Sequence, residues 1–222
     1  AGELIVGRGE YCDYPPEALA LPAVQSGADV NLEQIIALQP QVVFMGSMAH
    51  SDEQVKALES AGAVVVVSDA RDIEGVYTAI ELIGDVVDRK AEAAGLVQSM
   101  KDSFADVRAR AKSHEGEEKK SIYFEVSPLE YGLWTAGAGT FMDEIANMLG
   151  LTNAFADVEG WAEISEEQVI QRNPDYIVTI TMYYGEGPTP VEEIMGRSGW
   201  QNLVAVAGGR VYDADNDEIP PH

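Results

Sequence analysis

A ten-residue pattern occurs twice in this sequence, and it constrains the fold more than any other feature. The first copy, NLEQIIALQP, covers residues 31–40, and the second copy, SEEQVIQRNP, covers residues 165–174. An apolar run follows each copy, at 42–45 and at 176–179, and such runs are typical of buried strands. A polar residue that opens each copy favours a helix N-terminus, and the proline at its end stops the helix. The repeat therefore predicts one helix–strand unit used twice, and hence two related lobes.

Strand and helix patterns alternate along the rest of the chain. Ser165 and Gln168 have the spacing of a capping box, in which each residue satisfies a backbone N–H of the other. Continuous apolar runs favour parallel strands that are covered on both faces. Strands are predicted at residues 4–6, 42–45, 64–67, 122–126, 176–180 and 211–212. Helices are predicted from residues 31 and 165, and at 52–60, 73–87 and 140–149.

A long stretch of helix-forming residues separates the two halves. Residues 89–112 are rich in Ala, Glu, Lys and Arg and contain no proline, which predicts a continuous helix about 35 Å long. The fold class predicted from these patterns is α/β, with two Rossmann-like lobes of mostly parallel sheets joined by one long rigid helix. We expect the first lobe at 1–88, the connecting helix at 89–113 and the second lobe at 114–222.

The charge balance excludes several classes of partner. The 222 residues include 38 Asp and Glu against 14 Lys and Arg, a formal net charge of -24. Such a field repels polyanions, so nucleic acids and anionic membrane surfaces are not expected partners. No apolar run reaches 18 residues, so no transmembrane helix is predicted. The single cysteine, Cys12, cannot form an intramolecular disulfide.

A stiff aromatic loop follows the first predicted strand. Tyr11, Cys12, Asp13 and Tyr14 precede two consecutive prolines. Rigid loops that present tyrosines suit a large planar ligand, because tyrosine offers both a ring face and a hydrogen-bonding hydroxyl. The same pattern is equally compatible with a proline-capped turn that packs on the core.

The second half contains its own candidate ligand contacts. Residues 134–140 are glycine-rich and precede a predicted helix, so their free amides could hold an anion or an amide oxygen. The segment lacks the lysine of a P-loop and the spacing of a dinucleotide fingerprint. Trp161, which precedes the second repeat copy, either faces a cleft or belongs to the core.

Catalytic patterns are scarce. The three histidines, His50, His114 and His222, form no paired metal-binding motif, and no GxSxG nucleophile elbow is present. Asp13 discourages thiolate formation at the adjacent Cys12. We therefore expect a binding function, no enzymatic activity and no resident cofactor or metal.

The chain resembles the cobalamin-type substrate-binding proteins of ABC importers, which are helical-backbone, class III periplasmic binding proteins. The segment YCDYPPEA at residues 11–18 is similar to the SDYPPxA loop of that family. Further agreement extends in order through most of the chain, at residues 31–40, 123–125, 134–137, 160–161, 165–169 and 209–212.

The resemblance implies a corrinoid ligand captured between the two lobes and delivered to a membrane permease. Tyr11 and Tyr14 from one lobe are expected to line one cleft with Trp134 and Trp161 from the other. The complete set of ligand-binding residues that it suggests is Tyr11, Cys12, Asp13, Tyr14, Met48, His50, Trp134, Trp161 and Tyr183. The family docks through an acidic residue on each lobe, and the best matches are Asp52, with neighbouring Glu53, and Glu218. The resemblance further implies a periplasmic or extracytoplasmic lipoprotein whose anchor lies outside this segment.

Departures from the family pattern leave alternatives open. The residues after Met45 lack the tryptophan common in cobalamin binders, so a ferric siderophore or haem is the alternative ligand. An anionic siderophore would favour basic cleft residues, for which Arg8, Arg71 and Arg197 are candidates. A corrinoid-processing or metal-dependent enzyme on the same scaffold is the alternative of another class.

The ends of the chain also depart from the family. Family members begin with a strand and helix before Ala1 and finish with a helix after Pro220 and Pro221. Loss of the strand would leave backbone groups unpaired in the first sheet. The protein is expected to be a monomer unless another copy of the chain fills that gap.

Overall fold

The chain divides into two compact units. The first comprises residues 1–70 and 74–97, and the second comprises 71–73 and 98–222. The lobe and linker limits expected from the sequence stay predictions. The computed structural model describes residues 2–26, 30–46, 52–68, 70–112, 119–181 and 187–214.

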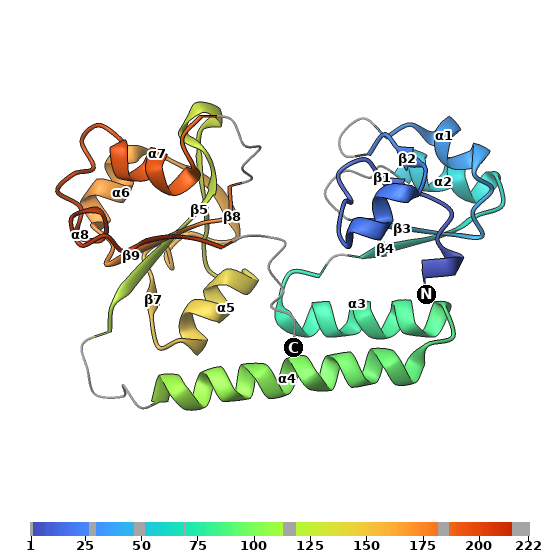
Figure 1. Cartoon of the computed structure of the whole chain (residues 1–222), viewed down its shortest axis with the longest axis horizontal. Coiled ribbons are helices and arrows are strands. Elements are labelled where there is room, and N and C mark those ends of the chain that lie inside the picture. The colour runs from blue at the N-terminus through green and yellow to red at the C-terminus, as the bar shows by residue number, and fades with distance from the viewer. Residues whose placement is uncertain are drawn as a thin grey trace. The chain divides into compact units, whose positions relative to one another are not determined.

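The first unit contains two separate pairs of parallel strands (Figure 1). Strand β1 (Arg8–Gly9) pairs with β2 (Ala23–Val24), and β3 (Val42–Gly46) pairs with β4 (Val64–Ser68). No other described strand extends either pair. Its helical elements are η1 (Gly2–Leu4), η2 (Pro16–Ala20), α1 (Leu32–Ala37), α2 (Asp52–Ser60) and most of α3 (Ile73–Val86).

The strand predicted at residues 4–6 is wrong. A short 3-10 turn covers Gly2–Leu4, and the N–H of Ile5 donates to the carbonyl of Gly2 at 3.2 Å. Leu4, Ile5 and Val6 are 61%, 47% and 48% exposed. This apolar run pairs with no described strand, and a strand without a partner loses its ladder of hydrogen bonds.

Apolar side chains of the first unit stay partly open to solvent. Phe44 on β3 and Leu82 and Ile83 on α3 are each about two-fifths exposed. They line an apolar groove of about 180 Å³ together with Met45, Gly46, Val66, Ser68 and Ala79. The described residues of this unit therefore leave apolar surface of the two-stranded β3–β4 sheet partly uncovered.

The second unit is built on one six-stranded sheet (Figure 1). The order along its main path is β10-β9-β5-β6-β8, and β7 also pairs with β5. The pairings among β10, β9, β5 and β7 are parallel, as predicted, whereas β6 is antiparallel to both β5 and β8. The strands are β5 (Ser121–Ser127), β6 (Leu133–Ala136), β7 (Thr152–Asn153), β8 (Trp161–Ile164), β9 (Tyr176–Thr179) and β10 (Val211–Asp213).

Helices cover both faces of this sheet. The helices are η4 (Leu129–Tyr131), α5 (Phe141–Met148), α6 (Glu166–Arg172), α7 (Pro190–Gly196) and α8 (Val204–Ala207). Tyr123 of β5 points into one apolar cluster with residues of α6, α7 and α8. Its neighbours Ile122 and Phe124 point into a second cluster with Met142 of α5. This alternation along β5 follows from the two-residue period of a strand.

The repeated element forms as predicted in both units. Asn31 accepts from the N–H of Gln34 at 3.1 Å and caps α1. Ser165 and Gln168 form the predicted capping box at α6. Just before its final proline each copy also contains a residue with positive φ, Gln39 at 50° and Asn173 at 45°.

The long helix predicted between the halves is also present. Helix α4 (Lys90–Ala111) has 22 residues, which corresponds to about 33 Å, and it contributes residues to both units. In the part of the chain that the structure describes, no helix is long and apolar enough to cross a bilayer.

Candidate ligand-binding site

Two exposed indoles lie on one face of the second unit's sheet. Trp134 of β6 is directly opposite Glu163 of β8, and Ala136 is opposite Trp161. Side chains two residues apart on a strand share a face, so Trp134 and Trp161 are diagonal neighbours on the same face. They are 40% and 46% exposed. The sheet therefore presents two flat apolar surfaces side by side.

Trp161 is supported from the helix side. Its ring lies 5.9 Å from the ring of Phe141, the first residue of α5, at a tilt of 56°. Thr140 caps α5 by accepting from the N–H of Asp143 at 3.3 Å. The contact with Phe141 covers the side of the Trp161 indole that faces α5 and leaves the rest of the ring exposed. Trp161 is therefore not a fully buried core residue.

Two amides of the glycine-rich segment 134–140 are bound within the chain and are not free for a ligand. The N–H of Gly137 donates to the carbonyl of Gly160 at 2.8 Å, and that of Ala138 donates to the carbonyl of Val158 at 2.7 Å. A Cβ on Gly137 would lie 2.1 Å from the same Val158 oxygen, so glycine is required for this close approach. The segment is thus a structural connection between β6 and α5.

The aromatic loop of the first unit is exposed. Tyr11 and Tyr14 are 70% and 51% exposed, and Cys12 and Asp13 are exposed beside them. The turn is closed by a hydrogen bond of 3.0 Å from the N–H of Cys12 to the carbonyl of Gly9, and the Tyr14–Pro15 peptide is cis. The alternative of a turn that packs its rings on the core is therefore wrong.

Arg8 holds this turn from inside. One guanidinium nitrogen, Nη1, lies 3.1, 2.9 and 3.0 Å from the carbonyl oxygens of Gly9, Glu10 and Cys12. The carboxylate of Glu10 accepts from the N–H of Ser26 at 3.2 Å. The positive charge of Arg8 is thus directed at the loop backbone.

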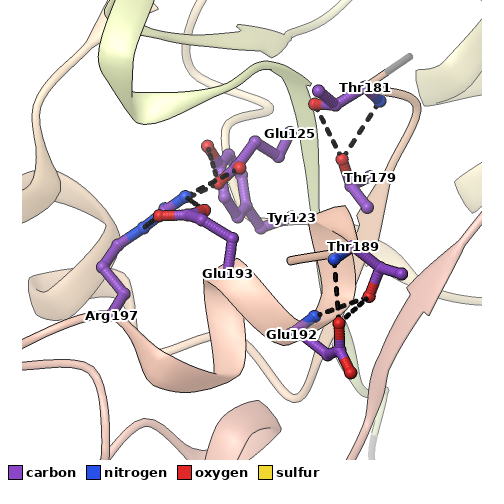
Figure 2. Close-up of polar contacts among 8 residues, drawn as sticks. All are labelled: Tyr123, Glu125, Thr179, Thr181, Thr189, Glu192, Glu193 and Arg197. Atoms are coloured by element: carbon purple, nitrogen blue, oxygen red, sulfur yellow. Dashed lines mark hydrogen bonds and ion pairs between the residues drawn. The ribbon is translucent and has the colours of Figure 1, made fainter. Parts of the chain in front are cut away.

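A buried ion pair anchors α7 to β5 (Figure 2). Arg197 donates from Nη1 and Nη2 to both carboxylate oxygens of Glu125, at 2.9 and 3.0 Å. It also binds Glu193, and its guanidinium lies 4.2 Å from the ring centre of Trp200. Both side chains of the Glu125–Arg197 pair are 2% exposed. Burial raises the pKa of the Glu125 carboxyl, and the hydrogen bonds from Arg197 oppose that rise.

Arg197 is therefore not a cleft residue, and the suggestion that it could bind an anionic siderophore is wrong, because its guanidinium is buried against Glu125. Arg8 donates to backbone carbonyls through Nη1, and its suggested role toward an anionic ligand stays a prediction. Sequence reasoning missed the Glu125–Arg197 pair, whose members are 72 residues apart. The only available signal was a charged residue, Glu125, within the apolar run of β5.

A polar row crosses the sheet beside this ion pair. Thr135 and Thr179 lie opposite Glu125 on its two sides, and both are fully buried. The hydroxyl of Thr179 bonds to that of Thr181 at 2.9 Å (Figure 2). Thr135 Oγ1 has no partner among the described residues. In the same view, Thr189 and Glu192 form a capping box at α7.

The remaining predicted site residues fall into two groups. Asp52 and Glu53 are exposed in the first turn of α2. Met48, His50, Tyr183 and Glu218 lie outside the described residues. Convergence of the tyrosine pair and the tryptophan pair stays a prediction, because the two pairs belong to different units. Within the described ranges, no group of three or more metal-ligating side chains occurs.

The family is decided by a match over nearly the whole chain. Residues 1–218 match the family model described as periplasmic binding protein. The chain belongs to this family. Members of the periplasmic binding protein family capture ligands for transport, so this protein is a binding protein and not an enzyme.

Individual relatives agree with this assignment. YvrC of Bacillus subtilis (strain 168), an uncharacterized ABC transporter substrate-binding lipoprotein, is 37% identical over 221 residues, covering 98% of this chain and 68% of its own. The vitamin B12-binding protein of Salmonella choleraesuis (strain SC-B67) is 30% identical over 181 residues, covering 80% of this chain and 65% of its own. The chain thus spans about two thirds of the length of these curated relatives.

A solved structure shows the same fold. The periplasmic heme-binding protein RhuT from Roseiflexus sp. RS-1, in its apo form, superposes with a TM-score of 0.82. It is 21% identical, and the match covers 96% of this chain and 82% of RhuT.

Proposed function

We propose that this periplasmic binding protein captures a corrinoid and delivers it to an ABC importer. The names of its relatives support the class of transport system, and the vitamin B12-binding protein of Salmonella supports the ligand. The observation that carries the proposal is the pair of exposed indoles, Trp134 and Trp161, on one face of adjacent strands.

A corrin is a large, nearly flat macrocycle with amide-bearing side chains. Indole rings stack well on such a surface, since each one buries a large apolar area and keeps an N–H donor at its edge. The exposed Tyr11 and Tyr14 offer a second aromatic surface on the other unit. We propose that the ligand is held between these two surfaces, with Cys12 and Asp13 beside the tyrosines and with Met48, His50 and Tyr183 completing the site.

Haem and ferric siderophores are the alternative ligands in the same class. The heme-binding protein RhuT has the same fold, which supports haem as a candidate. Many of these ligands carry carboxylates, however, and anionic ligands are normally met by arginine or lysine. Because Arg197 is buried in an ion pair with Glu125, a ligand with neutral amides is favoured over an anionic one.

An absorbance titration tests the ligand, because each chromophore reports its own binding. We expect saturable binding of cyanocobalamin that is tighter than binding of haemin or a ferric siderophore. Trp134→Ala and Trp161→Ala should each weaken it by about 1 to 3 kcal/mol, as expected for anchor residues. Tyr212→Ala, at a 50% exposed tyrosine on β10, is the control and should leave binding unchanged. Preference for haemin, or equal loss in the control, would contradict the corrinoid proposal.

Docking to the permease is proposed to use one acidic surface on each unit. Asp52 and Glu53 lie in the exposed first turn of α2, and Glu218 is the proposed partner in the second half. Asp52→Ala combined with Glu218→Ala should reduce transport by reconstituted importer and leave ligand affinity unchanged, since charges at an interface rim act mainly on association.

The internal repeat supplies a matched comparison for this test. Glu33 and Glu167 occupy equivalent positions in the first turns of α1 and α6, and both are exposed. The double variant Glu33→Ala, Glu167→Ala should be measured in parallel. If transport falls only in that variant, docking uses the repeated helices, and the assignment to Asp52 and Glu218 is wrong.

We further propose an extracytoplasmic location with a lipid anchor outside this segment, as the name of YvrC suggests for that relative. Fractionation of cells that carry the full-length protein would test it. The full-length protein should be found with the membrane, and removal of its lipid-anchored N-terminal segment should release it. Sedimentation of the ligand-free protein should show a monomer.

A further inference from the structure

Glu163 is a direct neighbour of both exposed indoles on the β6–β8 ladder. Glu163 is directly opposite Trp134 across the β6–β8 ladder, and Trp161 precedes it by two residues on the same strand. Directly opposite side chains have Cβ atoms about 5 Å apart, and residues two apart on a strand are separated by about 7 Å. The three side chains therefore form a triangle on one face of the sheet, with Glu163 at the corner that is adjacent to both indoles.

The Glu163 carboxylate is open to a ligand. Glu163 is exposed, and among the described residues it has no hydrogen bond or ion pair. The carboxylate extends toward Gly132 at the start of β6, where a Cβ would be 3.4 Å from Glu163 Oε1, an ordinary contact distance. Gly132 is a glycine for a separate reason, since its φ of 88° favours a residue without a Cβ.

Two arginines of the second unit are directed at other carboxylates. Arg197 is buried against Glu125 and Glu193. This pair lies on the face of β5 that carries Tyr123, opposite the face that carries Phe124. Arg172 forms a two-pronged pair with Asp157, at 2.6 and 2.9 Å. The field of a chain with a net charge of -24 adds to the negative potential at the Glu163 carboxylate.

We propose that Glu163 is a specificity-determining residue of the ligand site. Its carboxylate accepts a hydrogen bond from an amide N–H or an ammonium group of a ligand that stacks on the indoles, and it repels ligands that carry carboxylates. The inference rests on the proposed function, because it assumes that Trp134 and Trp161 contact the ligand. It adds the class of ligand: a planar molecule with N–H donors at its rim, of zero or positive net charge.

The test measures how one substitution changes the affinity for two ligands, one with neutral amides and one with carboxylates at the edge of its ring. Cyanocobalamin has neutral amides at its rim, and haemin has two carboxylates. Glu163→Gln keeps the size of the side chain and removes the charge, so the fold should be unaffected. The variant should bind cyanocobalamin about three- to tenfold more weakly and haemin about three- to tenfold more tightly. The haemin gain should shrink at about 1 M salt, because the lost repulsion is electrostatic.

Asp106→Asn is the matched control. Asp106 is an exposed residue of α4 that pairs with Arg110 at 3.1 Å, and its replacement makes the same change in net charge far along the sequence from β8. The ratio of haemin affinity to cyanocobalamin affinity in the Asp106→Asn variant should equal the ratio in the unaltered protein. A ratio that shifts equally in Asp106→Asn would show a general charge effect and would overturn the role of Glu163.

The two proposals fail in different ways. If the unaltered protein binds neither ligand, the corrinoid proposal and the role of Glu163 both fall. If the unaltered protein binds cyanocobalamin but Glu163→Gln changes neither affinity, or lowers both, only the role of Glu163 is overturned. A merely structural role would move both affinities in one direction, whereas the proposal requires opposite directions.

Discussion

The two copies of the repeated helix–strand pattern differ in how deeply their side chains are buried. In the second unit the repeat copy packs deeply: Val169 on α6 and Ile177 on β9 are both 0% exposed. In the first unit α1 has no buried residue, and Phe44 on the following strand is 42% exposed. The two copies share their caps and their positive-φ stops, so the difference does not come from the repeat itself.

The difference comes from the sheets. Strand β9 has a hydrogen-bonded neighbour on each side, whereas β3 pairs with no described strand other than β4. Local sequence is enough to form the helix and the strand, but burial needs neighbouring strands that carry further helices. A repeat in the sequence therefore predicts equivalent local structure without predicting equivalent stability.

Breaking the buried ion pair should give the largest effect. Arg197→Met leaves the Glu125 carboxylate buried without its cationic partner, with only the Tyr123 hydroxyl donating to it at 3.4 Å, which should cost about 3 to 5 kcal/mol of the free energy of unfolding. Hydrogen exchange should show the loss in the second unit. The double variant Glu125→Leu, Arg197→Met removes both charges and should recover most of the stability. A loss below about 1 kcal/mol in the single variant would contradict the importance of this pair.

Truncating equivalent residues of the repeat tests the comparison directly. Val169→Ala removes a fully buried side chain and should cost about 2 kcal/mol. Ile35→Ala, at the equivalent position of the first copy, removes more atoms from a half-buried site and should cost less than about 1 kcal/mol. Hydrogen exchange of each unit provides the measurement. Equal costs would mean that the two copies contribute equally to stability.

The caps should behave alike in both units. Ser165→Ala and Asn31→Ala each remove an acceptor for a first-turn N–H and should each cost about 1 kcal/mol. Thermal unfolding, with hydrogen exchange of α1 and α6, would show the loss. Near-equal losses of stability in the two cap variants would sharpen the comparison, because the two units would then differ in side-chain burial and not in helix capping. A cap effect in one unit alone would contradict it.

The smallest predicted effect is on the stability of the second unit at low pH. Burial acts to raise the pKa of the Asp175 carboxyl, but the N–H and hydroxyl of Ser121, at 2.9 and 3.2 Å, hold it below the ordinary value. A lowered folded-state pKa gives stability that is present above the unfolded-state pKa and is lost as pH falls through the folded-state pKa. Asp175→Asn should therefore flatten the acid side of the stability curve of the second unit. An unchanged curve would show that Asp175 does not contribute.

The sequence predicted the elements whose signals are local. The helix at 52–60 and the capping box at Ser165 have the predicted positions, since caps, prolines and periodicity act within a few residues. The strand expected at 4–6 failed because a strand also needs a distant partner. The antiparallel strands β6 and β8 were not anticipated, although Pro128 and Gly132 mark the turn between β5 and β6.

The candidate site was only partly predictable. Trp134 and Trp161 were identified from their neighbours in the sequence, but their diagonal placement depends on the register of β6 and β8. Glu163 could not be singled out among 38 acidic residues until that register was known. Arg197 was misassigned because nothing near it in the sequence indicates that Glu125 lies beside it in space.

The placement of the three tryptophans gives this protein a built-in optical reporter. Trp200 is fully buried and lies against the Arg197 guanidinium, whereas Trp134 and Trp161 are open to solvent. Intrinsic fluorescence should therefore separate into a blue-shifted component that acrylamide cannot reach and a red-shifted component that it quenches. A ligand stacked on the exposed pair would shield the second component and leave the first unchanged, so occupancy could be followed without any label.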